Sequence, residues 1–253
     1  SGIPIKQMND GRSEDFRNHF AVTHFFNPPR YLKLFEIIPG PDCKNEIIAF
    51  LNDFGERFLG KVSVLAKDTP GFIVNRVARP FYGEALRIYE EGIADFATID
   101  WAMTELGGFR MGPFTLMDYI GNDINYTVTE TVFAAFYFDP RFKPSFTQKR
   151  HMEAGFLGRK TSRGFYDYKE GSSLPTPTKD PILGQLIFER ILVLLINEAA
   201  DAVFMQVASP NAVDLAMTKG VNYPKGLLAW ADELGAEWVL DKLETLFSEY
   251  GED

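Results

Sequence analysis

One segment of this chain is repeated, and the repeat restricts the fold more than any other feature. Residues 73–121 match residues 187–235 without a gap, a shift of 114 positions. The matched pairs include Ile73 and Ile187, Arg76 and Arg190, Glu84 and Glu198, Asp100 and Asp214, and Gly112 and Gly226. A constant shift over this length predicts two copies of one module. Two related modules are expected to pack as a pseudo-symmetric pair, as two subunits do in a homodimer.

The apolar spacing within both copies is typical of helices, so we expect a mainly α protein. Strands are expected only near the N-terminus, over residues 19–26, 33–38 and 62–66. Helices are expected over residues 44–59, 72–91, 96–106, 113–121, 123–138, 145–154, 182–206, 210–218, 225–233 and 236–249. Residues 170–181 are rich in proline, serine and threonine, which is typical of a linker. The predicted organisation is a segment with strands (1–67), a first helical module (68–169), the linker (170–181) and a second helical module (182–253).

Composition excludes several classes of function. The net charge is −9 and no cluster of lysine and arginine stands out, which argues against nucleic acid and an anionic membrane surface as partners. No apolar stretch has the length of a membrane span, and the N-terminus lacks the pattern of a signal peptide. Cys43 is the only cysteine and the three histidines have no metal-ligand spacing. We therefore expect no disulfide, no metal site and a cytoplasmic location.

Two polar residues interrupt the first two predicted strands. If these strands pair in an antiparallel way about Arg30, His24 and Glu36 face each other directly. Directly opposed side chains are close enough for a hydrogen bond, and a histidine oriented by a carboxylate is a ready general base. The alternative is a satisfied core histidine beside a surface glutamate. The mirrored positions favour the functional interpretation.

The segment 68–76 predicts the start of a helix, with Thr69 as the N-cap and Pro70 as the first helical residue. A helix start does not explain Asn75, an amide on a mostly apolar stretch. Such an amide could donate a hydrogen bond to a carbonyl or an oxyanion.

Two glycine-rich segments have simpler interpretations beside the functional one. Residues 158–166 combine two glycines with lysine and arginine, and composition alone favours a basic solvated loop over a phosphate or dinucleotide cradle. Residues 107–114 have a counterpart in residues 220–227 of the second copy, which predicts a structural corner between helices.

These residues, in this order, resemble the signature stretches of the 3-hydroxyacyl-CoA dehydrogenases. The resemblance rests on residues 24–28, Glu36, and residues 68–82, 111–114 and 158–166. It covers nearly the whole chain, and the doubled helical module looks like the bacterial 3-hydroxybutyryl-CoA or 3-hydroxyadipyl-CoA branch of the family. Such enzymes pair a Rossmann NAD domain with a helical C-terminal domain.

The resemblance implies a role for each candidate residue. It places the family's catalytic histidine on His24, the orienting glutamate on Glu36 and the substrate-contacting asparagine on Asn75. The family's NAD contacts fall on Asn27 and Lys160. The resemblance further implies an acyl-CoA substrate and a role in fatty-acid or aromatic-acid degradation. It also implies a homo-oligomer, with the second module standing in for a dimer partner.

The main departure from the family is the missing dinucleotide fingerprint, because no G-x-G-x-x-G occurs in the sequence. We therefore expect two tandem helical modules preceded by the last strands of a truncated α/β Rossmann domain. Such a C-terminal portion is expected to be inactive alone. One alternative is a catalytically idle helical assembly module that binds no cofactor. Another is a different hydroxyacid dehydrogenase with a similar helical domain, against which segment 68–76 argues.

Overall fold

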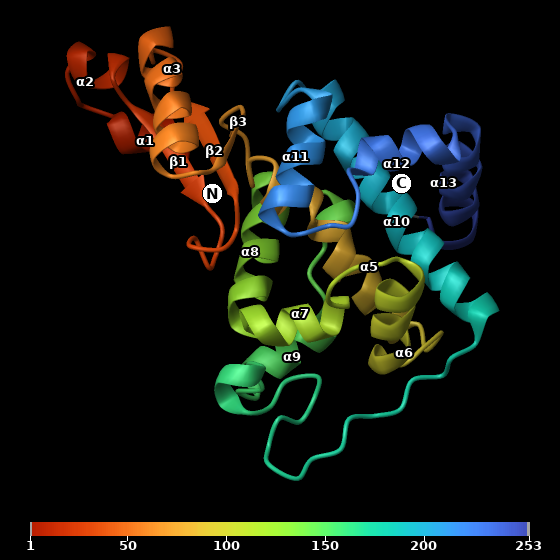
Figure 1. Cartoon of the computed structure of the whole chain (residues 1–253). Coiled ribbons are helices and arrows are strands. Elements are labelled where there is room, and N and C mark those ends of the chain that lie inside the picture. Colours follow the sequence, from red (N-terminus) through yellow and green to blue (C-terminus); the bar gives the residue numbers. More distant parts are fainter. Residues whose placement is uncertain (1, 252–253) are drawn as a thin grey trace. The chain divides into compact units, whose positions relative to one another are not determined.

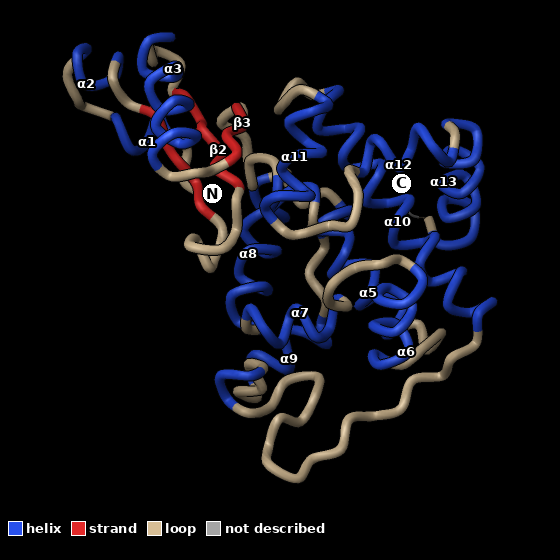
Figure 2. Tube along the Cα trace, in the orientation of Figure 1, coloured by secondary structure: helices blue, strands red, loops and turns tan. Residues whose placement is uncertain are grey.

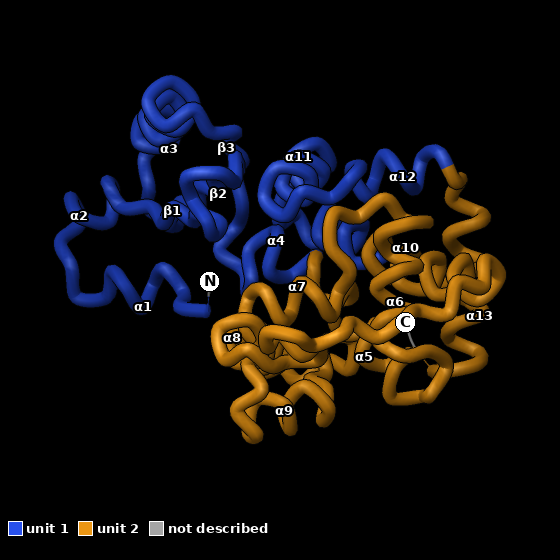
Figure 3. Tube along the Cα trace, turned by 60° about the horizontal axis from the view of Figure 1, so that its bottom comes forward, with its two compact units in different colours: residues 1–77, 197–233 blue, residues 78–196, 234–253 orange. Residues whose placement is uncertain are grey.

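The computed structural model describes residues 2–251, and these residues form mostly helices with one small sheet (Figure 2). The chain divides into two compact units (Figure 3). Unit 1 comprises residues 1–77 and 197–233, and unit 2 comprises residues 78–196 and 234–253. Within the described part of the chain, no helix combines the length and the apolar character needed to cross a bilayer.

Unit 1 contains the sheet and the helices around it (Figure 1). Its elements are α1 (Ile5–Asn9), α2 (Glu14–Asn18), β1 (Ala21–Phe25), β2 (Leu34–Pro39), α3 (Asn45–Asp53), the π-helical turn η1 (Phe54–Phe58), β3 (Val62–Leu65), α4 (Val74–Val77), the C-terminal part of α10 (Pro181–Phe204), α11 (Pro210–Gly220) and most of α12 (Leu227–Leu234). The strand order is β1-β2-β3, with β1 antiparallel and β3 parallel to β2.

The central strand β2 is the core of unit 1. Leu34, Ile37 and Ile38 are fully buried, because β1 and β3 cover both edges of β2 and α3 and α11 pack against it. The approach of α11 is close enough to require glycine. A Cβ added to Gly220 would lie 2.6 Å from Leu34 Cδ2. The predicted register is confirmed, since His24 lies opposite Glu36.

Unit 2 is helical. Its elements are α5 (Arg79–Glu90), α6 (Phe96–Trp101), the π-helical turn η2 (Ala102–Leu106), α7 (Pro113–Ile120), α8 (Asn122–Ala135), η3 (Pro140–Phe142), α9 (Phe146–Glu153), η4 (Arg159–Thr161), the N-terminal part of α10, and α13 (Ala236–Tyr250). Its core is rich in aromatic rings. Phe114 packs edge-on against Phe165 with ring centroids 4.8 Å apart, and Phe96 packs similarly against Tyr166 at 4.9 Å. Such edge-to-face pairs fix the loop that carries Phe165 and Tyr166.

Most predicted helices and strands are confirmed to within a few residues, but the helix predicted over 72–91 is wrong at its start. Thr69 does not cap a helix, because its carbonyl accepts the Phe72 N–H at 3.0 Å and closes a turn. Gly71 and Phe72 have positive φ angles of 78° and 50°, so helical geometry begins only at α4. Pro80 lacks an N–H and sits in the first turn of α5, which separates α5 from α4. The short helices α1 and α2 were not predicted.

Candidate active site

The predicted pair of His24 and Glu36 forms a hydrogen bond. Strand pairing sets the two side chains opposite each other, and His24 Nδ1 lies 2.6 Å from Glu36 Oε2. The Glu36 side chain is fully buried, whereas the His24 side chain is 23% exposed. The alternative of a surface glutamate is therefore wrong. A buried carboxylate is costly without partners, and the histidine is the first of its partners here.

The second carboxylate oxygen of Glu36 is bound by backbone. Glu36 Oε1 accepts hydrogen bonds from the Ile73 N–H and the Val74 N–H, both at 3.1 Å. The positive φ angles of Gly71 and Phe72 turn the chain so that these two N–H groups face the sheet. Three donors therefore hold Glu36 in one orientation.

The carboxylate determines the tautomer of the histidine. An ionised carboxylate only accepts hydrogen bonds, so the hydrogen of a neutral His24 ring must lie on Nδ1. Its lone pair then lies on Nε2, which makes no hydrogen bond to any residue that the structure describes. Phe26 and Phe72 pack edge-on against the ring at centroid distances of 4.7 and 5.6 Å. A fixed ring with a free lone pair is suited to accept a proton from a substrate.

Asn75 and Asn27 lie on the segments next to this pair. Asn75 directly follows Val74, whose N–H binds Glu36, and its side chain is partly buried. Asn27 is exposed on the loop that follows β1, three residues after His24. The structure thus brings the segments of four predicted site residues together in unit 1.

Lys160, the fifth predicted residue, belongs to unit 2. Its ammonium binds both carboxylate oxygens of Asp123, at 2.6 and 2.8 Å. Although partial burial would raise the pKa of Asp123, the hydrogen bond and the charge of Lys160 lower that pKa below its usual value. This pairing does not test the predicted cofactor contact, which stays a prediction.

The loop around Lys160 is held by packing. A Cβ on Gly158 would lie 2.2 Å from the Asp118 carbonyl oxygen, and one on Gly164 would lie 1.9 Å from Asp118 Oδ1. The Arg163 guanidinium lies 3.9 Å from the centre of the Phe156 ring. These contacts explain both glycines and one arginine structurally.

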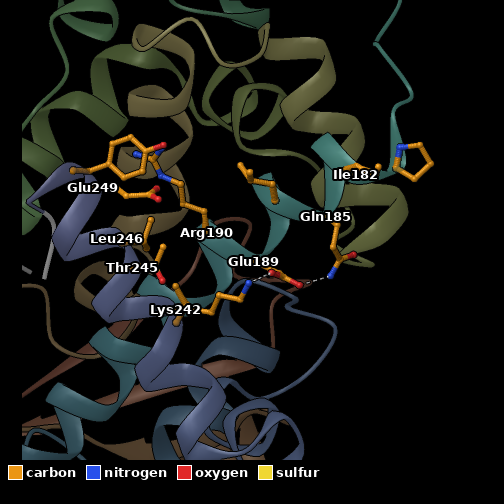
Figure 4. Close-up of a pocket in the computed structure, with 12 residues that line it drawn as sticks. Ile182, Gln185, Glu189, Arg190, Lys242, Thr245, Leu246 and Glu249 are labelled. Carbon is orange, nitrogen blue, oxygen red and sulfur yellow. Dashed lines mark hydrogen bonds and ion pairs between the residues drawn. The ribbon is translucent and has the colours of Figure 1, made fainter.

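A separate cavity of about 580 Å³ lies in unit 2 between α10 and α13 (Figure 4). Ile182 and Leu246 contribute apolar surface. Its polar groups bind one another, since Glu189 accepts from Lys242 at 2.8 Å and from Gln185 at 2.9 Å (Figure 4). None of the residues predicted for the site lines this cavity.

Sequence reasoning missed a set of charged residues close to Asn75. Arg76 is 2% exposed, and its Nε donates to Glu198 Oε1 at 2.5 Å while its NH2 group binds Asp201. The available signal was the repeat, which keeps an arginine and a glutamate at matching positions of both copies. Charged residues retained on helices that are otherwise apolar indicate buried ion pairs.

Comparison with family models matches both parts of the chain. The model described as "3-hydroxyacyl-CoA dehydrogenase, NAD binding domain" matches residues 1–69. The model described as "3-hydroxyacyl-CoA dehydrogenase, C-terminal domain" matches residues 71–168 and 186–253.

Individual proteins give the same result. The chain is 32% identical over 318 aligned residues to the 3-hydroxyadipyl-CoA dehydrogenase of Escherichia coli, covering 92% of this chain and 67% of that protein. It is 40% identical over 153 residues to the mitochondrial hydroxyacyl-coenzyme A dehydrogenase of Sus scrofa, covering 60% of this chain and 48% of the relative. The chain therefore spans 48% and 67% of the lengths of these two relatives.

Solved structures are similar as well. The crystal structure of an Escherichia coli 3-hydroxybutyryl-CoA dehydrogenase matches with a TM-score of 0.91 and 30% identity, over 99% of this chain and 71% of that one. The (S)-3-hydroxybutyryl-CoA dehydrogenase of Ralstonia eutropha matches with a TM-score of 0.62 and 34% identity, over 66% of this chain and 58% of that one.

Proposed function

The chain belongs to the 3-hydroxyacyl-CoA dehydrogenase family, and on that premise we propose that it carries the proton-transfer site of an NAD-dependent oxidoreductase. The proposed reaction interconverts a (3S)-3-hydroxyacyl-CoA and a 3-oxoacyl-CoA. The observation that carries the proposal is the hydrogen bond of 2.6 Å between His24 and the buried Glu36. Oxidation of a hydroxyl requires a base, and this pair provides one.

Each residue of the site has a part in the proposed reaction. His24 Nε2 accepts the proton of the 3-hydroxyl as the C3 hydrogen leaves as hydride. Glu36 holds the ring in the Nδ1–H tautomer and stabilises the imidazolium that forms. Asn75 donates a hydrogen bond to the acyl carbonyl of the substrate. NAD, when bound, supplies the hydride acceptor.

The residues that would hold NAD are only partly represented. Asn27 is an exposed amide on the loop after β1 and fits a contact near the reacting end of the cofactor. Lys160 is the second proposed contact, and its bond to Asp123 would have to rearrange or be shared. No glycine-rich turn for a pyrophosphate occurs in the sequence. We assign no other cofactor contact to this chain.

Replacing His24 tests the proposal. In the purified full-length protein, reduction of acetoacetyl-CoA is followed through the loss of NADH absorbance. His24→Gln should lower kcat by roughly 10²- to 10⁴-fold, because the base is removed. His151→Gln is the matched control, since His151 stacks on Phe165 in unit 2 at a ring distance of 4.3 Å. Equal activity in the two variants would contradict the assignment of His24.

The second candidate is a helical assembly module that binds no cofactor. Calorimetry with acetoacetyl-CoA separates the two candidates. Binding that Asn75→Ala abolishes supports the dehydrogenase site. No binding of acetoacetyl-CoA to the purified protein supports the assembly module.

We also propose that the helical part arose by duplication, with the second copy in the place of a dimer partner. Matching positions of the two copies share unusual backbone angles. Gly108 and Asn222 have φ angles of 69° and 55°, and Gly92 and Gln206 have φ angles of 72° and 56°. Non-glycine residues rarely adopt positive φ, so this agreement supports a common origin.

Hydrogen bonds recur in the same way. Asp100 accepts the N–H groups of Phe114 and Thr115, both at 2.8 Å. Asp214, 114 positions later, accepts those of Leu228 and Ala229, at 2.9 and 3.0 Å. Corresponding aspartates therefore bind the first N–H groups of corresponding helices, α7 and α12, in the two copies. Residues 107–112 lie between η2 and α7, and Gly108 has a positive φ angle. The corner between helices that was predicted from residues 107–114 is therefore confirmed.

A further inference from the structure

The backbone of the short helix α4 (Val74–Val77) contributes to the dyad. Its first residue, Val74, and the preceding Ile73 supply the two N–H groups that bind Glu36 Oε1. If α4 moved away, Glu36 would keep only its contact with His24. The orientation of the carboxylate, and therefore of the ring, depends on where α4 lies.

Helix α4 cannot hold that position by itself. It has four residues, and a single helical turn is unstable without tertiary contacts. The turn before it contains Phe72 at a φ of 50°, a conformation that L-residues other than glycine adopt only when surrounding contacts enforce it. Contacts from elsewhere in unit 1 must therefore fix α4.

Helix α4 is bound by charged residues of α10 and is also packed against α11. Arg76 is the charged residue of α4, and its guanidinium is bound by Glu198 at 2.5 Å and by Asp201. Glu198 is 2% exposed and Asp201 is 28% exposed. Both carboxylates lie more than a hundred positions later in the chain, in the second copy of the repeat.

The repeat contains a second arginine of the same kind. Arg190 is 3% exposed, binds the fully buried Glu84, and binds Glu91 at 2.8 Å. Each arginine thus pairs with a glutamate of the other copy. Arg190 differs in one respect, because it lies in the middle of a helix of 24 residues whose own hydrogen bonds fix its backbone. Loss of its partners should reduce stability without displacing a catalytic group.

We propose that Glu198 and Asp201 are positioning residues for the His24–Glu36 dyad, acting through Arg76 and α4. This inference rests on the proposed dehydrogenase function and deepens it. It assigns to the second copy a role in catalysis beyond assembly, because α10 keeps the N–H groups of Ile73 and Val74 on Glu36. A purely structural ion pair would affect stability alone.

The test compares carboxylate-to-amide variants of the two clusters in the purified protein. Glu198→Gln is matched by Glu84→Gln, and the milder Asp201→Asn is matched by Glu91→Gln, since Asp201 and Glu91 are 28% and 33% exposed. Both members of each pair should lower the melting temperature to a similar degree. Only Glu198→Gln and Asp201→Asn should lower kcat, by about tenfold to a hundredfold.

A spectroscopic measurement separates positioning from activity. The hydrogen on His24 Nδ1, bound to a buried carboxylate, should give a far-downfield proton NMR line. The chain has three histidines, so His24→Gln identifies the line. This line should broaden or shift in folded Asp201→Asn and stay unchanged in Glu91→Gln.

An unchanged line together with unchanged kcat in Asp201→Asn would overturn the inference. The outcome stays distinct from failure of the proposed function. If the unmodified full-length protein shows no dehydrogenase activity, the proposed function fails, whereas the comparison of NMR lines still decides whether α10 positions the dyad.

Discussion

At the scale of single residues, the properties of the site depend on which atom of His24 carries the hydrogen. Glu36 uses one oxygen for His24 Nδ1 and the other for the backbone of Ile73 and Val74. An ionised carboxylate satisfies both sets of donors at once. No other side chain of this size can do so, because an amide offers one acceptor and one donor.

Glu36→Gln should therefore separate folding from catalysis. The amide oxygen would accept the two backbone N–H groups, and the amide nitrogen would donate to His24 Nδ1. The ring hydrogen would then move to Nε2, which could no longer accept a proton. We expect kcat to fall by roughly 10²- to 10⁴-fold with a small change in melting temperature. Retained activity in this variant would show that the tautomer is not limiting.

At the scale of elements, one buried carboxylate anchors the loop that follows η4. Asp118 is 1% exposed and accepts from the Phe165 N–H at 3.0 Å, the Tyr166 N–H at 2.9 Å and the Tyr168 hydroxyl at 3.0 Å. Together with burial, the negative charge of Asp118 raises the pKa of the Tyr168 hydroxyl above its usual value.

Asp118→Asn should lower the free energy of unfolding by about 2 to 3 kcal/mol, because the amide nitrogen would face a buried backbone N–H. The repeat provides the control. Asp232 lies 114 positions later and is exposed, so Asp232→Asn should change the free energy by less than about 0.5 kcal/mol. Urea unfolding of both variants measures the difference, and equal losses would show that the loop is not anchored by Asp118.

The sequence predicted most elements and the central pair of the site. The register of β1 and β2 was predictable because His24 and Glu36 lie at mirrored positions on two strands joined by one short loop. The helix start at α4 was not predictable, because nothing in the sequence distinguishes the left-handed Phe72 from a helical phenylalanine. The two N–H groups that bind Glu36 result from that turn, so they were missed as well. Backbone donors leave no residue signature.

At the scale of the whole molecule, the two proposed copies have diverged in chemistry. The position that corresponds to Asn75 is Glu189, which binds Lys242 at 2.8 Å. Arg76 and Arg190, in contrast, keep the same kind of partners. The two copies therefore share the arginine–glutamate ion pairs, which are the kind of contact that a dimer interface uses. The predicted site residues, in contrast, lie before the first copy, within it, or in the loop that follows it.

The dependence of stability on pH should reveal another residue that the copies share. Burial raises the pKa of Asp100 to about 6, and hydrogen bonds from Thr115, Phe114 and Tyr166 offset only part of that rise. In the unfolded chain the ordinary value of 3.8 applies. Between about pH 4 and pH 6 the folded protein therefore binds more protons than the unfolded chain, so this residue lowers stability as the pH rises.

Asp100→Asn should remove the contribution of Asp100 to the decrease in stability between about pH 4 and pH 6. The difference between about 6 and 3.8 corresponds to about 3 kcal/mol, which is the upper limit of the effect at neutral pH. Urea unfolding at several pH values should show the free energy of the variant falling less than that of the unmodified protein between pH 4 and pH 6. Asp214→Asn reports the separate effect of losing the same backbone hydrogen bonds in the second copy. Parallel curves for Asp100→Asn and the unmodified protein would mean that Asp100 stays ionised throughout, with its four donors outweighing burial.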